Sequence, residues 1–96
     1  MQRMTQHQLE MVVDRINIIT WSPSAPYTSK DGGGVVANTG CFYLAGANGG
    51  WRLERIAHGG GSYDALTCGY VSMHELYNMM IPFIRGLEIP MTGGQQ

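Results

Sequence analysis

The dipeptide Asn48-Gly49 constrains the fold of this chain more than any other feature of its sequence. It separates two runs of strand composition, 41–46 and 51–57. A type I′ turn needs positive φ at both of its central residues, and Asn-Gly adopts that conformation readily. The sequence therefore predicts an antiparallel hairpin in the middle of the chain. A further short strand is predicted over 64–68, which completes a three-stranded antiparallel β-meander.

Two capping-box patterns predict helices on either side of this meander. Thr5 is followed by Gln8, and Ser72 is followed by Glu75. In such a pair, the hydroxyl and the second side chain each satisfy a backbone amide that the first helical turn leaves unpaired. Apolar residues recur at helical spacing behind both patterns: Leu9, Val12, Val13 and Ile16 in the first segment, and Leu76, Met80, Phe83 and Ile84 in the second.

The sequence also indicates where these helices end. The first helix is expected to fade near Asn17, because the next two residues break the apolar period. The last helix is expected to run from Met73 towards Arg85, with Gly86 as its stop. Pro82 lies inside this helix and is expected to kink it or end it early, since proline removes one backbone hydrogen bond.

Between the first helix and the first strand, residues 20–40 are predicted to form one long loop. Pro23 and Pro26 argue against a regular helix or a central strand, and the glycines at 32–34 are typical of turns. A loop of this length in a small domain is usually either disordered or functional. We expect this loop to contact a ligand or a partner.

The predicted fold class is α+β: an N-terminal helix, a long loop, a three-stranded antiparallel β-meander and a C-terminal helix. A chain of 96 residues forms one small domain, which we assign to residues 1–90. Residues 91–96 match part of a common epitope tag and are set apart as a C-terminal tail. Because so short a chain buries little apolar surface by itself, we expect a homo-oligomer, a dimer or higher.

The charge of the chain limits the partners that it can have. The formal net charge is −1, and the six basic residues are scattered along the sequence. Proteins that bind long DNA or RNA carry a clustered basic stripe, so no long nucleic acid is expected, whereas a small anion needs only a few cations. No apolar run approaches the roughly 18–20 residues that span a bilayer, so we expect a cytoplasmic protein without a membrane partner. Cys41 and Cys68 are accordingly expected to be free thiols.

The three consecutive glycines Gly59, Gly60 and Gly61 are the main candidate for a ligand contact. Their amides could face a phosphate, as in backbone anion nests, or the glycines could simply connect two strands. Arg52 and Arg55 lie on opposite sides of a predicted strand, so that one could meet a phosphate, or both could be solvated. Nearby aromatic residues could stack on a base or pack in the core: Trp51, Tyr63, Tyr70 and Tyr77.

Catalytic and metal chemistry lack a recognisable pattern. The histidines and cysteines show no pair at metal-ligand spacing, so neither a metal nor a cofactor is expected. His58 borders the glycines and His74 stands in a first helical turn, where each could hydrogen-bond a ligand. Cys68 or Ser62 would need one of these histidines together with Asp64 to act as a nucleophile, and no local signature supports that arrangement. We therefore expect a protein that is not an enzyme.

Four segments, taken in order, resemble a family of small phage proteins. They are N-G-G-W-R-L-E-R-I, H-G-G-G-S-Y-D, G-Y-V-S-M-H-E-L-Y-N-M-M and F-I-R-G-L-E, within residues 42–88. The family is identified as the phage Thoeris anti-defence proteins, which act as sponges for cyclic nucleotide signals. Its stacking aromatic residue falls on Asn48, its polar residue before the glycines on His58, and its basic helix residue on His74. All three positions differ here, which leaves open which signal is bound.

The resemblance implies a phage-encoded homo-oligomer that sequesters a cyclic ADP-ribose isomer or a cyclic oligonucleotide in an infected bacterium, without cleaving it. The residues expected to hold the ligand are Asn48, Arg52, Arg55, His58, Gly59, Gly60, Gly61, Tyr63, His74 and Tyr77. The main alternative is a protein-binding inhibitor of a host defence complex, which would act through an exposed apolar or charged face. A third is a small hydrolase that acts on the same signals.

Overall fold

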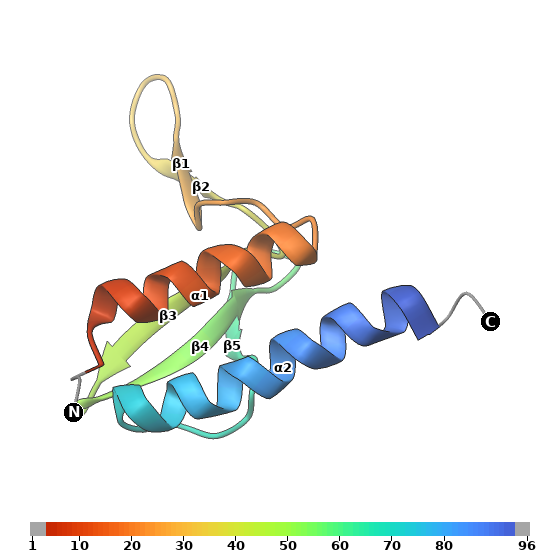
Figure 1. Cartoon of the computed structure of the whole chain (residues 1–96). Helices are drawn as coiled ribbons and strands as arrows, with labels where there is room; N and C mark the ends of the chain where they lie inside the picture. Colours follow the sequence, from red (N-terminus) through yellow and green to blue (C-terminus); the bar gives the residue numbers. More distant parts are fainter. Residues whose placement is uncertain (1–3, 94–96) are drawn as a thin grey trace.

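Two helices lie side by side on one face of a three-stranded sheet (Figure 1). The computed structural model describes residues 4–93, with side chains described as far as residue 88. The elements in chain order are α1 (Gln6–Ile19), β1 (Tyr27–Ser29), β2 (Val35–Ala37), β3 (Phe42–Ala47), β4 (Gly50–Ile56), β5 (Ser62–Asp64) and α2 (Met73–Gly93). The sheet has the antiparallel order β3-β4-β5, and β1 pairs with β2 in a separate hairpin. The predicted α+β class and its meander are confirmed.

α1 begins as its capping box predicts. Thr5 is the N-cap: its hydroxyl accepts a hydrogen bond from the Gln8 amide at 3.2 Å, and its amide donates to Oε1 of Gln8 at 2.9 Å. The helix continues two residues past Asn17, the predicted end. The amide and the hydroxyl of Thr20 both donate to the Ile16 carbonyl, at 3.0 and 2.7 Å, and hold the last turn although the apolar period is broken there.

The segment 20–40 is not one loop, because its middle forms the hairpin of β1 and β2. Tyr27 lies opposite Ala37 in this antiparallel pair. The glycine-rich turn is closed by the Lys30 amide, which donates to the Gly34 carbonyl at 3.1 Å. The turn residues therefore join two short strands, which the two prolines precede but do not interrupt. This hairpin projects away from the helices and the sheet (Figure 1).

The turn between β3 and β4 has the predicted conformation. φ is 53° at Asn48 and 76° at Gly49, so both central residues have the positive φ of a type I′ turn. Gly50 follows in β4 and lies against the segment that leads into α2. A Cβ at this position would be 3.1 Å from the backbone carbon of Tyr70 and 3.2 Å from the amide nitrogen of Val71. This close approach of two backbones therefore needs glycine.

β5 differs from the predicted third strand. It begins at Ser62 and ends at Asp64, whereas the prediction begins at Asp64. The side chain of Asp64 accepts hydrogen bonds from the amides of Leu66 at 3.2 Å and Gly69 at 2.7 Å. Aspartate bonded in this way to its own following backbone forms a turn, so the chain leaves the sheet where the sequence predicts that it enters.

The core lies between the sheet and the two helices. Its buried residues are Leu9, Val13 and Ile16 from α1, Phe42 and Leu53 from the sheet, and Leu76, Met80 and Ile84 from α2. Successive residues of β4 alternate between the two faces, so that Leu53 packs beneath the helices while Arg52 and Glu54 lie on the other face. The helices therefore cover one face of the sheet, and the other face carries Arg52 and Glu54 beside the buried Ile56.

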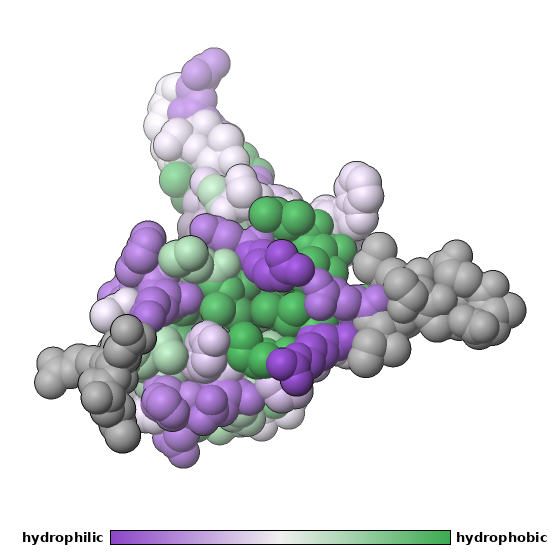
Figure 2. Space-filling view, viewed as in Figure 1, coloured by the Kyte–Doolittle hydropathy of each residue, from purple (hydrophilic) through white to green (hydrophobic). Residues whose placement is uncertain are grey.

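Apolar surface is visible where α1 and α2 meet (Figure 2). Val12, Ile19 and Phe83 are only partly buried against the core. An ion pair between Arg15 and Glu88, 2.7 Å apart, also links the two helices and is itself largely exposed. The helices are thus joined both through the core and at their outer surface.

α2 is longer than the sequence predicts. Its start is the predicted capping box: the Glu75 amide donates to the Ser72 hydroxyl at 3.1 Å, and the Ser72 amide donates to Oε1 of Glu75 at 3.0 Å. The predicted stop at Gly86 is wrong, because the helix passes Pro82 and Gly86 and continues to the end of the described residues. Gly86 does not adopt the left-handed conformation with which a glycine ends a helix. The three last residues of the predicted tail, 94–96, lie outside the described residues.

Candidate functional site

The structure places six of the predicted ligand residues at opposite ends of β4. Asn48 lies in the turn before this strand, and His74 lies near the same end because the segment before α2 pairs with the start of β4. His58 and the glycines 59–61 follow the other end of the strand. A strand of seven residues is about 20 Å long. One protomer therefore does not bring the two groups into one pocket.

Both predicted arginines are engaged within the fold. Arg52 donates from Nε to Oε2 of Glu54 at 2.7 Å, and its guanidinium lies 4.4 Å from the ring centre of Tyr70. Arg55 donates from Nε to a backbone carbonyl at 2.9 Å, and its guanidinium lies 4.5 Å from the ring centre of Phe42. A phosphate at either arginine would have to compete with these contacts.

The other predicted residues lie on the surface or against the core. Tyr63 on β5 is 47% exposed, whereas Tyr77 packs against the core from α2. In the glycine loop, φ is 95° at Gly59 and 100° at Gly60, and the Gly60 amide donates to a carbonyl of the same turn at 3.0 Å. The amides of Gly59 and Gly61 donate no hydrogen bond to another described residue. The loop is therefore an exposed turn with two free amides.

A buried carboxylate organises the face of the sheet away from the helices. Glu54 is 6% exposed, and its Oε1 accepts hydrogen bonds from Tyr43 Oη at 2.7 Å and Ser62 Oγ at 2.9 Å. Burial opposes ionisation of this carboxyl, but the hydrogen bonds from Tyr43, Arg52 and Ser62 outweigh it and hold its pKa below the usual range. These residues come from all three strands, so the network fastens the sheet together. Ser62, a candidate nucleophile by sequence, donates here to a carboxylate.

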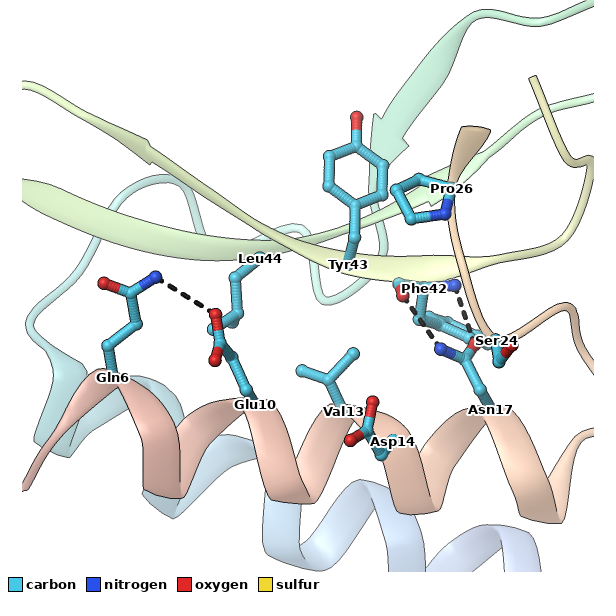
Figure 3. A pocket seen from close by; sticks show the side chains of 10 residues that line it. All are labelled: Gln6, Glu10, Val13, Asp14, Asn17, Ser24, Pro26, Phe42, Tyr43 and Leu44. Atoms are coloured by element: carbon cyan, nitrogen blue, oxygen red, sulfur yellow. Dashed lines mark hydrogen bonds between the residues drawn. The ribbon is translucent and has the colours of Figure 1, made fainter. Parts of the chain in front are cut away.

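A groove runs along α1, between this helix and the outer edge of β3 (Figure 3). One hollow of about 330 Å³ is lined by Gln6, Glu10, Val13, Asp14, Asn17, Ser24, Pro26, Phe42, Tyr43 and Leu44. A second hollow of about 430 Å³ shares Asp14, Asn17 and Ser24 with the first. Because they share these residues, the two hollows form one groove, which we call the α1–β3 groove.

The register of the β3–β4 hairpin determines which backbone groups of β3 face the α1–β3 groove. Ala47 lies opposite Gly50 across the two-residue turn. In such a hairpin, the residue beside the turn directs its amide and carbonyl towards the partner strand, and so does every second residue from it. The residues between them direct these groups outward: Phe42, Leu44 and Gly46. In the part of the chain that the structure describes, β3 is an edge strand, so no further strand meets these groups.

Asn17 replaces a neighbouring strand at one of these three positions. The Phe42 amide donates to Oδ1 of Asn17 at 2.8 Å, and Nδ2 of Asn17 donates to the Phe42 carbonyl at 3.0 Å. Leu44 and Gly46 have no such hydrogen-bond partner among the described residues. The edge of β3 is therefore open at Leu44, which lines the α1–β3 groove, and at Gly46 further along the strand.

The residues that line this groove are not among the ligand contacts predicted from the sequence. Asn17 is 3% exposed and lies four residues after Val13 in the apolar stripe of α1. A polar residue within an apolar stripe must find hydrogen-bond partners, and this signal could have identified it. Glu10 and Asp14 are exposed on the same helix, where their sequence pattern is that of any solvated helical face.

The fold and the α1–β3 groove define a small two-layer α+β domain with an open sheet edge. Comparison of the chain with protein families, with curated proteins and with solved structures gives no match. Within the part of the chain that the structure describes, no three histidine, cysteine, aspartate or glutamate side chains are grouped as metal ligands. No helix in that same part is long and apolar enough to cross a membrane.

Proposed function

We propose that this chain is a binding protein without catalytic activity, which attaches to a protein partner by accepting an extended segment of that partner as a new strand beside β3. The observation that carries this proposal is the open edge of β3, where Leu44 in the α1–β3 groove and Gly46 further along the strand have backbone groups without a partner among the described residues. Strand edges of this kind pair readily with another chain, and native proteins usually cover or blunt them.

The size of the open edge sets what this pairing contributes. Two residues, each with one amide and one carbonyl, offer four main-chain hydrogen bonds. At about 1 kcal/mol net for each, they supply about 4 kcal/mol, half of the roughly 8 kcal/mol of a micromolar complex. Side-chain contacts within the α1–β3 groove must supply the other half. Specificity is therefore expected to come from the walls of the groove.

The resemblance to phage anti-defence proteins indicates the setting in which such a protein would act. The partner would be a component of a host defence complex in an infected bacterium. Occupying that component requires tight binding and no chemical step, so this setting is compatible with a domain whose candidate site is a strand edge.

Proline substitution at the edge tests the proposal. Gly46→Pro removes an outward amide without removing a bond to β4, and edge strands tolerate proline at such positions. Gly46→Ala is the matched control, because it adds a Cβ at the same place, 3.3 Å from the Trp51 ring, and keeps the amide. Peptides selected from a random library on the wild-type protein are expected to bind Gly46→Ala and to lose binding to Gly46→Pro. Equal binding to both folded variants would rule out strand addition.

Sequestration of a cyclic nucleotide is the second candidate. The two free amides of the exposed glycine loop, at Gly59 and Gly61, are the observation that favours it. A second protomer would have to join this loop to the residues at the other end of β4. Calorimetry with glycocyclic ADP-ribose and with cyclic di- and trinucleotides is expected to show binding, and the ligand is expected to be recovered intact after heat release. If none of these compounds binds, sequestration of a cyclic nucleotide is ruled out, and a cleaved ligand would indicate a hydrolase.

A further inference from the structure

We propose that the partner segment carries basic side chains at two positions separated by one residue, and that the carboxylates of Glu10 and Asp14 pair with them. This inference rests on the proposed strand addition and names the chemistry of the partner. It follows from the spacing of the two carboxylates and from the absence of a counter-charge for them among the described residues.

The spacing of the acidic residues on α1 matches the spacing of an added strand. Glu10 and Asp14 are four residues apart, which is about 6 Å along a helix. Residues on one face of a strand are two apart, which is about 6.7 Å. α1 runs beside β3 in the opposite direction, since Asn17 meets Phe42 while Glu10 lies beside Leu44 (Figure 3). Successive side chains on one face of an added strand therefore reach successive carboxylates.

The face that an added strand would turn towards α1 follows from the register. Residues directly opposite one another in a sheet share a face. The side chain of Leu44 packs towards the helices, so a partner residue opposite Leu44 also faces α1. The residues two before and two after it face the same way. Every second residue of the segment thus lies beside the acidic wall of the α1–β3 groove.

The two carboxylates lack a counter-charge in the described part of the chain. Asp14 accepts no hydrogen bond and joins no ion pair among the described residues, and Glu10 accepts one hydrogen bond, from Gln6 at 3.1 Å. Of the described residues that line the α1–β3 groove, none is basic. Arg15, the basic residue next to Asp14, pairs with Glu88 of α2. The groove therefore presents negative charge beside open backbone groups.

This charge also decides between a foreign segment and a second copy of the chain. If β3 of one copy paired with β3 of another, the two α1 helices would lie on the same face of the joined sheet. Glu10 and Asp14 of both copies would then line one groove, and like charges directly opposite one another are destabilising. A basic segment from a different protein is the occupant that this charge favours.

The test compares capped nine-residue peptides that differ only at the charged positions. The first alternates threonine with lysine, so that its lysines lie on one face of a strand. Two others replace each lysine by glutamine or by glutamate, and a fourth keeps the composition of the first but places its lysines in adjacent pairs. Binding is measured by calorimetry at low and at high salt, because paired surface charges weaken with ionic strength.

The alternating lysine peptide is expected to bind about tenfold more tightly than the glutamine peptide at low salt, with each pair contributing about threefold. The glutamate peptide is expected not to bind, and the peptide with adjacent lysines to bind more weakly than the alternating one. Glu10→Gln together with Asp14→Asn should remove the lysine preference. Asp31→Asn, an exposed carboxylate in the turn of the β1–β2 hairpin, should leave it unchanged.

The outcomes separate this inference from the proposed function. If the lysine, glutamine and glutamate peptides bind equally and Gly46→Pro abolishes all three, strand addition stands and the pairing with Glu10 and Asp14 is overturned. If no peptide binds the wild-type protein at millimolar concentration, both are overturned. If lysine binding survives Gly46→Pro but not the double acidic substitution, the carboxylates hold a basic chain without strand addition, which overturns the proposed function.

Discussion

Replacement of Asn17 by alanine is the most informative single perturbation of this fold. The Asn17 side chain satisfies both the amide and the carbonyl of Phe42, at 2.8 and 3.0 Å, and it is 3% exposed. Leaving a buried polar group without a partner costs about 1–3 kcal/mol. Two such groups of Phe42, its amide and its carbonyl, would lose their partner. Because the α1–β3 groove allows some access of water to them, we expect a total loss in the lower part of the summed range, about 2–4 kcal/mol.

This loss is large for a domain of 96 residues, whose total stability is expected to be about 5–10 kcal/mol. It corresponds to a decrease of about 10–20 °C in the midpoint of thermal unfolding. Urea unfolding followed by circular dichroism measures it directly. Asn78→Ala is the matched control, because Asn78 is an exposed asparagine on α2 and its replacement should change stability by less than about 0.5 kcal/mol. Equal, small losses in both variants would refute the role of Asn17 as a substitute strand.

Three further predictions follow from buried or crowded positions. The pKa of Glu54 is lowered in the folded state, so the ionised carboxylate stabilises the fold above about pH 4.5, and this contribution is lost as pH falls through the folded pKa. Glu54→Gln should therefore flatten the acid side of a plot of unfolding free energy against pH, and an unchanged acid side would contradict this. Burial raises the pKa of the Cys41 thiol, which is 0% exposed, so an alkylating reagent should modify Cys41 only after unfolding, as measured by mass spectrometry. Alkylation of Cys41 in the native protein as fast as in the denatured protein would contradict this prediction. Gly50→Ala should lower the free energy of unfolding by about 1–3 kcal/mol, because its Cβ would lie 3.1 Å from the Tyr70 backbone. Gly61→Ala is the control: its Cβ would have no described neighbour within 4 Å, so the same urea titration should show almost no loss.

Local signals predicted the parts of the fold that depend on neighbouring residues. Both capping boxes form, and Asn48-Gly49 adopts the turn that its conformational freedom favours. Each of these features needs only residues within a few positions of one another. The sequence pattern therefore located both helix starts and the central hairpin.

The predicted end of α2 and the predicted third strand were wrong because contacts with other elements or with side chains determine where these elements end. Gly86 was expected to stop α2, but nothing in its surroundings forces the left-handed conformation, and Glu88 beyond it joins Arg15 of α1. The third strand was misplaced because the Asp64 side chain bonds to the backbone that follows it. Such contacts do not produce a periodic pattern in the sequence.

The α1–β3 groove was the part of the molecule that the sequence predicted least. Six of the ten predicted ligand contacts lie at the two ends of β4, and the role of all ten in sequestration stays a prediction. The α1–β3 groove depends on which edge of the sheet stays unpaired and on how far Asn17 covers it. Strand order and side-chain capping of an edge both follow from tertiary packing, and the sequence marks neither.

Amide hydrogen exchange along β3, followed residue by residue by nuclear magnetic resonance, tests the open strand edge most directly. Tyr43 and Ala45 are bonded to β4 and should exchange slowly, Phe42 should be protected by Asn17, and Leu44 and Gly46 should exchange rapidly. Saturation with the alternating lysine peptide should then slow Leu44 and Gly46. Protection of these two amides in the free protein, or no change on saturation, would contradict the account.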